Sequence, residues 1–121
     1  MVIPVLVASV AAFVVSAVWY TAFGRVWAEL SPAGAAARPS PWRLGAEFGR
    51  TLVLVVVFVV LAAGTSWPAW SLAALVWAGF PLTILAGSVL HERVPVCLAA
   101  LHAGDWLVKI VVVATVLGVW R

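Results

Sequence analysis

The chain has 121 residues, of which 66% are hydrophobic and only 9% are charged. Soluble domains are about 45–50% apolar and about 25% charged, so this chain lacks the polar side chains that a water-facing surface needs. Its net charge of +3 comes from scattered Lys and Arg residues that form no basic run, which argues against a nucleic-acid partner. A lipid bilayer is therefore the expected environment.

Four stretches are long and apolar enough to cross a bilayer as helices, which takes roughly 20 residues each. They cover residues 3–23, 44–64, 70–90 and 95–120, with connecting loops at 24–43 and 91–94. The Val-rich second stretch could be a strand by propensity, but an isolated strand in hydrocarbon leaves its backbone groups unpaired. We therefore expect a single all-α domain over residues 1–121, an integral membrane four-helix bundle.

Positive charge predicts the orientation of these spans. The two loops contain Arg25, Arg38, Arg43 and Arg93, whereas the opposite side holds only Arg121 and the terminal amine. Because Lys and Arg are enriched in cytoplasmic loops, both loops are expected in the cytoplasm and both termini outside it.

Small residues predict which helix faces pack together in lipid. The first span offers Ala8, Ala12 and Ser16 at a spacing of four. The third span offers Gly79, Thr83 and Gly87 at the same spacing.

A proline and two tryptophans lie deep within the spans. Pro81 has no N–H, which frees the carbonyl of Trp77 and predicts a kinked third helix that acts as a hinge or is accommodated by its neighbours. Trp77 and Trp106 lie too deep for interfacial aromatic belts, so each indole N–H is expected to face protein.

Five ionisable residues lie within the spans, where such residues are rare and mark functional positions. His102, Asp105 and Lys109 share one face of the fourth helix, and Glu47 and Arg50 share one face of the second. In one interpretation this polar stripe lines a hydrated path that relays protons or binds a polar solute. In the other, Asp105 pairs with Lys109 and Glu47 with Arg50 in a neutral network that orients the helices, an interpretation that the charge balance favours. Arg50 could also reach Asp105 if their helices are neighbours.

The sequence offers no sign of catalysis or of a cofactor. It has no catalytic triad motif, no Gly-rich phosphate loop, and no second histidine or acid near His102 at the spacing of a metal site. An enzyme, a metal centre and a cofactor are therefore not expected.

Two regions carry a family resemblance. The first is AAFVVSAVWYTAFGRVW at residues 11–27, and the second combines WAGFPLTILAGSVL at 77–90 with LHAGDWLVKIVVVATVLGVW at 101–120. Together they resemble the bacterial domain of unknown function 1761 family, small proteins of about four spans. The resemblance implies a helical bundle in the bacterial inner (plasma) membrane and transfers no activity.

The family motif lies at the cytoplasmic end of the first span, where aromatic and cationic side chains anchor to lipid headgroups or bind a lipid or partner. Its residues are Trp19, Tyr20, Phe23, Gly24, Arg25 and Trp27.

The leading functional hypothesis is a small channel- or transporter-like protein for protons or a small polar solute. The alternative is a non-transporting scaffold or accessory subunit of a membrane complex, in which the same charges lock helices together. A homo-oligomer is expected, because four short helices have little interior in which to bury two charged pairs and eight tryptophans.

Overall fold

The computed structural model describes residues 2–35 and 40–120. Arg38 and Arg121, which entered the orientation prediction, lie outside the described residues. The described part of the chain is helical and contains no strand, which confirms the all-α prediction. Four helices are long and apolar enough to cross a membrane: Val2–Ala22 (α1), Pro41–Ala63 (α4), Ala69–Glu92 (α5, η1 and α6) and Val96–Val119 (α7).

Prolines and caps explain where three of the long helices begin. The Ser40 side chain accepts the backbone N–H of Arg43 at 3.4 Å and caps α4, whose first residue is Pro41. Pro68 precedes α5 and Pro95 precedes α7, each with extended backbone that cannot continue a helix backwards. The starts of α5 and α7 thus follow from the prolines that precede them.

The turn between α6 and α7 depends on one left-handed residue. Arg93 has φ 57°, a conformation uncommon outside glycine. It lets the backbone N–H of Val94 reach back to the carbonyl of Ser88 at 3.3 Å, which satisfies an orphan group at the end of α6.

Two short helices, α2 (Gly24–Leu30) and α3 (Pro32–Ala35), lie within the segment expected as a loop from 24 to 43. They fold back on each other where Gly34 approaches Trp27. A Cβ at Gly34 would lie 2.5 Å from the Trp27 carbonyl oxygen, so only glycine allows this approach. Pro32 is the first residue of α3 and Pro41 is the first residue of α4, because proline is favoured in a first helical turn.

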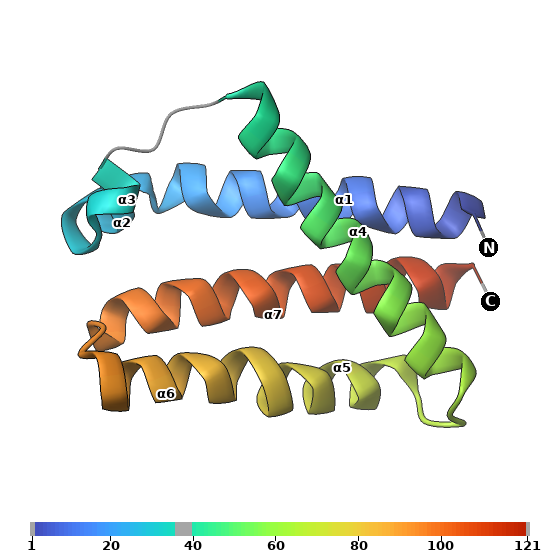
Figure 1. Cartoon of the computed structure of the whole chain (residues 1–121). Coiled ribbons are helices and arrows are strands. Elements are labelled where there is room, and N and C mark those ends of the chain that lie inside the picture. The colour runs from blue at the N-terminus through green and yellow to red at the C-terminus, as the bar shows by residue number, and fades with distance from the viewer. Residues whose placement is uncertain (1, 36–39, 121) are drawn as a thin grey trace.

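Helix α7 lies at the centre of the bundle, between α1 on one side and α5, η1 and α6 on the other (Figure 1). Helix α4 crosses this layer obliquely and packs mainly on α1. Both termini lie at one end of the bundle, and α2, α3 and the α6–α7 turn lie at the other.

Small residues allow α1 to approach α7 closely. Ala8 and Ala12 are fully buried and Ser16 is 6% exposed, as their spacing predicts. Ala8 and Ala12 belong to a core cluster that includes Phe58 of α4 and Val113 of α7. This apolar core fills the half of the bundle nearer the termini.

The third span contains a π-helical turn, η1 (Ala78–Leu82), around Pro81. The Thr83 hydroxyl donates to the Ala78 carbonyl at 2.8 Å and satisfies one backbone group of this wider turn. The kink expected at Pro81 stays a prediction.

The small-residue row of the third span faces outward within the chain. A Cβ placed at Gly79 or Gly87 would meet nothing within 4 Å, and Thr83 is exposed. The helix packs instead through Leu72 and Ala73, which belong to the core cluster. Rows of small residues that face lipid and rows that face protein cannot be distinguished in a sequence, because lipid and the bundle interior are similarly apolar.

Candidate functional site

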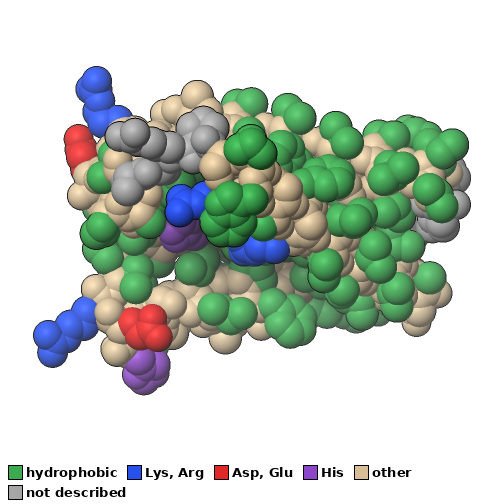
Figure 2. Space-filling view, turned by 45° about the horizontal axis from the view of Figure 1, so that its top comes forward, with side chains coloured by type: hydrophobic (Ala, Val, Ile, Leu, Met, Phe, Trp, Pro, Cys, Tyr) green, Lys and Arg blue, Asp and Glu red, His purple; other side chains and the backbone are tan. Residues whose placement is uncertain are grey.

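A polar cavity of about 430 Å³ lies in the half of the bundle that contains α2 and α3. Figure 2 shows basic and histidine side chains gathered toward one half of the visible face, while the rest of that face is mainly hydrophobic. All five residues of the predicted polar stripe line the cavity. Its walls are formed by Phe13, Ser16, Ala17, Tyr20, Trp27, Leu44, Glu47, Arg50, Leu85, His102, Asp105, Trp106 and Lys109.

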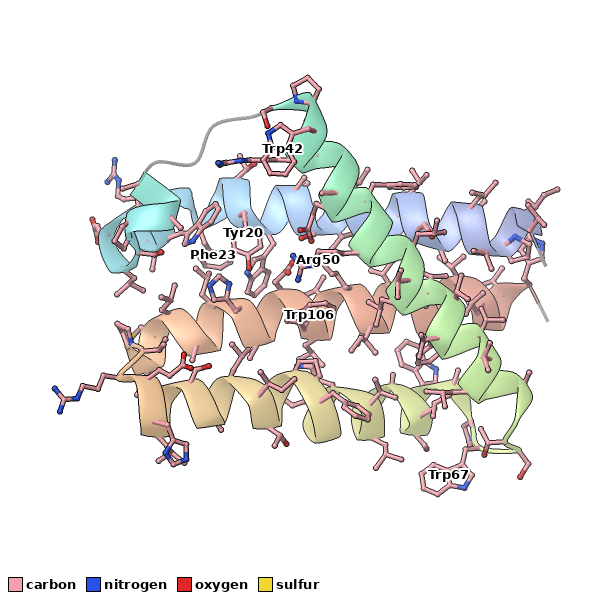
Figure 3. The ribbon with its side chains drawn as sticks, in the orientation of Figure 1. Tyr20, Phe23, Trp42, Arg50, Trp67 and Trp106 are labelled. Atoms are coloured by element: carbon pink, nitrogen blue, oxygen red, sulfur yellow. The ribbon has the colours of Figure 1, made fainter. Side chains whose placement is uncertain are left out.

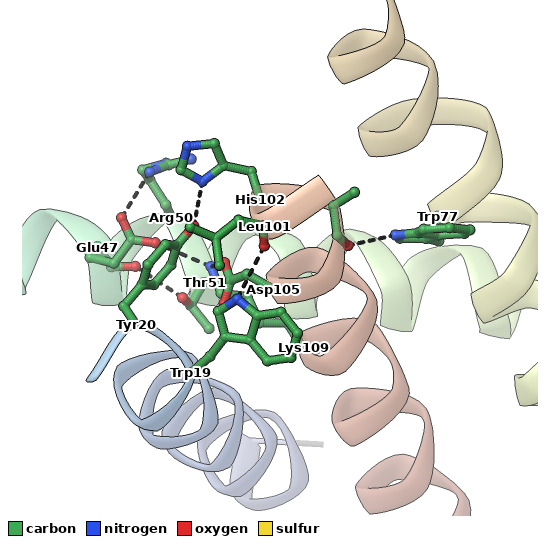
Figure 4. Close-up of polar contacts among 11 residues, drawn as sticks. Trp19, Tyr20, Glu47, Arg50, Thr51, Trp77, Leu101, His102, Asp105 and Lys109 are labelled. Atoms are coloured by element: carbon green, nitrogen blue, oxygen red, sulfur yellow. Dashed lines mark hydrogen bonds and ion pairs between the residues drawn. The ribbon is translucent and has the colours of Figure 1, made fainter. Parts of the chain in front are cut away.

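Four charged side chains form a continuous chain of ion pairs in this cavity (Figure 4). Arg50 Nη1 lies 2.8 Å from Glu47 Oε2, and Glu47 Oε1 lies 3.3 Å from Lys109 Nζ. Lys109 Nζ lies 3.1 Å from Asp105 Oδ2. Acids and bases therefore alternate along the chain, and each internal charge has two partners.

Helix geometry explains these pairs. Side chains lean toward the N-terminus of their helix, so Lys109 reaches back along α7 to Asp105, one turn earlier. Within α4, Glu47 and Arg50 are three residues apart and share a face. The contact that joins the two helices is that of Lys109 with Glu47, whereas the sequence suggested one of Arg50 with Asp105. The oblique course of α4 changes which residues of α4 and α7 meet (Figure 1).

Burial differs along the chain of ion pairs. The side chains of Asp105 and Lys109 are 4% and 3% exposed, whereas those of Glu47 and Arg50 are 35% and 62% exposed. The second carboxylate oxygen of Asp105, Oδ1, is buried and has no hydrogen-bond partner. A buried, unpaired acceptor is costly and calls for an explanation.

The aromatic motif of α1 packs on the same face of α7 as the polar stripe. The Trp19 indole N–H donates to the Leu101 carbonyl at 3.1 Å. Its ring lies over Gly104, where a Cβ would come within 2.5 Å of the ring. The Tyr20 hydroxyl lies 2.6 Å from His102 Nδ1. The motif therefore contacts the polar stripe directly.

Of the remaining motif residues, one lines the cavity and three do not; Phe23 is labelled in Figure 3. The Trp27 ring lies 4.7 Å from that of Tyr20 and lines the cavity. Phe23 is 39% exposed, and Gly24 and Arg25 lie outside the cavity lining.

Two deep tryptophans behave differently. The Trp77 indole N–H donates to the Ala103 carbonyl at 2.9 Å, which confirms that it faces protein. Trp106 lines the cavity and lies beneath two cations, with Lys109 Nζ 4.6 Å and Arg50 Cζ 5.8 Å from its ring centre. Both distances suit cation–π interaction.

Sequence reasoning missed Tyr20, Trp27 and Trp106 as walls of the cavity. Trp106 lies between Asp105 and Lys109 on the helix, so its position in the stripe was a usable signal. Tyr20 is three residues from the expected end of the first span, and His102 is seven from the start of the fourth. Antiparallel neighbours place these two residues at similar depths.

The chemistry that this site offers is ionic and hydrogen-bonding recognition. Among residues 2–35 and 40–120, no group of three His, Cys, Asp or Glu side chains lies close enough to hold a metal ion. The cavity presents guanidinium and ammonium donors, carboxylate acceptors and aromatic rings. These groups can bind a polar solute or pass protons.

Four membrane-length helices around a polar cavity place this chain among multi-pass membrane proteins. The chain belongs to the family described as protein of unknown function (DUF1761), whose match extends over residues 3–118 and confirms the resemblance read from the sequence. No curated protein and no solved structure matches it.

Proposed function

We propose that this protein is a small transporter-like membrane protein that binds a polar solute or protons in the cavity between α1, α4 and α7. The observation that carries this proposal is a 430 Å³ cavity lined by every ionisable residue of the stripe. A polar space of this size can hold water or a small solute beside the ion pairs, which a network that served only to fasten helices does not need.

A carrier is favoured over an open channel. The cavity lies in one half of the bundle, and the apolar core with Val55, Phe58 and Val113 fills the other half. These three side chains are at most 2% exposed, so the packed core supports a barrier to ions on that side. Passage would therefore require a second conformation. The π-turn around Pro81 is a candidate hinge, because π-turns recur at functional sites.

The proposed location is the bacterial inner membrane, with the cavity near the cytoplasmic side. Arg25 and Arg93 belong to the end that carries α2, α3 and the α6–α7 turn. The positive-inside rule then places both termini outside the cytoplasm. A reporter that works only in the cytoplasm should be inactive when fused after the C-terminus, and activity there would overturn this orientation.

A scaffold or accessory subunit is the second candidate function. It is favoured by one observation, the ion pair of Lys109 with Glu47, which fastens α7 to α4. In either role we propose a homo-oligomer, whose contacts would use outward faces such as the row of Gly79, Thr83 and Gly87.

Flux measurements separate the two candidates. The full chain in lipid vesicles is tested for proton movement with a trapped pH-sensitive dye, and for uptake of radiolabelled sugars and amino acids. The double variant Asp105→Asn, Lys109→Met removes a matched pair of charges, and Thr115→Val, at an exposed position of α7, serves as the control. Flux that disappears only in a well-folded double variant supports transport. An absence of flux through the wild-type protein would reject transport and favour the scaffold function.

A further inference from the structure

The chain of ion pairs has two free ends of opposite charge. At one end, Arg50 uses one guanidinium nitrogen for Glu47 and keeps its other N–H donors, on a side chain that is 62% exposed. At the other end, Asp105 uses Oδ2 for Lys109 and leaves Oδ1 without a partner. The two internal groups of this series of ion pairs therefore have two ionic partners each, whereas the two terminal groups keep hydrogen-bonding capacity that is not used.

A single molecule that binds both Arg50 and Asp105 must carry a negatively charged group for the guanidinium and a positively charged group for the carboxylate. A guanidinium recognises a carboxylate through parallel N–H bonds, and a buried carboxylate oxygen recognises an N–H donor such as an ammonium. Asp105 lines the cavity, so a donor bound there can approach the carboxylate whose Oδ1 has no partner. Such a molecule would join the two free ends of the existing network.

The charge balance of the cavity selects against a simple ion. Glu47 and Asp105 offset Arg50 and Lys109, so the walls carry no net charge from these four residues. A solute with one net charge would enter without a counter-charge, which is costly away from water. A zwitterion brings equal amounts of both charges.

Most of the remaining wall is apolar or aromatic. Phe13, Leu44, Leu85 and the rings of Trp27 and Trp106 line the cavity of about 430 Å³, and the remaining polar groups of the wall come from Ser16, Tyr20 and His102. Ligand sites of about 300–1,000 Å³ hold small organic molecules, and apolar walls favour an apolar body between the charged groups and the protein.

We infer that the cavity binds a small zwitterion of the amino-acid type with an apolar side chain. Arg50 receives its carboxylate, Asp105 receives its ammonium group, and the aromatic walls hold its side chain. This inference rests on the proposed function, because it names the solute class of the same cavity.

Three probes of one shape test the inference on the full chain in lipid nanodiscs. L-leucine carries both charges, isocaproate lacks the ammonium group, and isoamylamine lacks the carboxylate. Isothermal titration calorimetry should show leucine binding at least about tenfold more tightly than either analogue, because each analogue forfeits a charged hydrogen bond. Equal or tighter binding of an analogue, or no binding of leucine, overturns the inference.

One variant and its control locate the binding. Arg50→Gln removes the guanidinium at the exposed end of the ion-pair series. The dissociation constant of this variant for leucine should be about tenfold or more above that of the wild type, whereas its dissociation constant for isoamylamine should change little. Arg43→Gln changes an exposed arginine of the same helix that lies outside the cavity lining, and should leave leucine binding unchanged. Equal effects of the two variants contradict the site.

Binding and flux then fail independently. Leucine binding without leucine or proton flux keeps the zwitterion site and removes the transport function. Proton flux that depends on Asp105 and Lys109, without leucine binding, keeps the transport function and removes the zwitterion site.

Discussion

Replacing Lys109 by methionine isolates the contribution of the buried charge network. The Lys109 side chain is 3% exposed and contacts Asp105 at 3.1 Å and Glu47 at 3.3 Å. Methionine keeps an unbranched apolar stem and removes the ammonium group. Both oxygens of Asp105, whose side chain is 4% exposed, then lack a partner. Removing one partner of a buried pair costs about 3–5 kcal/mol, so the free energy of unfolding should fall by that amount.

The double variant Asp105→Asn, Lys109→Met should be less destabilised than Lys109→Met alone. It leaves no uncompensated buried charge, since Glu47 keeps its pair with Arg50 at 2.8 Å. Replacing a whole buried pair is often close to neutral, and we expect a loss of about 2 kcal/mol or less. The double variant should then be at least about 1 kcal/mol more stable than Lys109→Met.

Reversible unfolding in mixed detergent micelles, followed by far-ultraviolet circular dichroism, measures both changes. Arg25→Met, at an exposed position of α2, makes a similar change outside the cavity and should have little effect. A double variant as unstable as Lys109→Met, or a Lys109→Met variant as stable as the wild type, contradicts a costly unpaired charge at Asp105.

Three further substitutions test single contacts by the same unfolding measurement. Gly104→Ala places a Cβ 2.5 Å from the Trp19 ring and should lower the free energy of unfolding by about 1–3 kcal/mol. The control Gly118→Ala, in open space on the same helix, should be neutral or stabilising. Equal effects of the two variants contradict a tight contact of Trp19 with Gly104. Trp77→Phe removes a 2.9 Å hydrogen bond to a carbonyl of α7 and should cost about 1 kcal/mol, and an unchanged stability would show that the bond contributes nothing. Tyr20→Phe removes the hydroxyl 2.6 Å from the imidazole of α7 and should cost about 1 kcal/mol, and a gain in stability contradicts a favourable bond.

The four spans were predictable because the requirements of a bilayer are severe. Roughly 20 apolar residues per span and a satisfied backbone leave few alternatives to helices in a chain with this composition. Ala8, Ala12 and Ser16 were also predictable as a buried face, because their spacing follows the helical repeat. The family membership followed from the motif around Trp19 and Tyr20.

Partners across helices were less predictable than partners within one helix. Asp105 with Lys109 and Glu47 with Arg50 follow from spacings of four and three residues. The contact of Lys109 with Glu47 depends on the tilt of α4, which no local pattern encodes. The contact of Tyr20 with His102 likewise requires that α1 and α7 be neighbours, and four apolar helices allow several arrangements.

The contact of Lys109 with Glu47 connects the two proposed functions. Helix α4 packs mainly on α1, and in the polar half of the bundle this ion pair joins it to α7. A zwitterion bound between Arg50 and Asp105 would draw Arg50 away from Glu47 and Asp105 away from Lys109, since its carboxylate and its ammonium group offer each of them another partner. Glu47 and Lys109 would then pair with each other alone, which would strengthen the contact of α4 with α7 in the half of the bundle that contains the cavity. The residues that fasten the helices are then the same residues through which a bound solute would act on them.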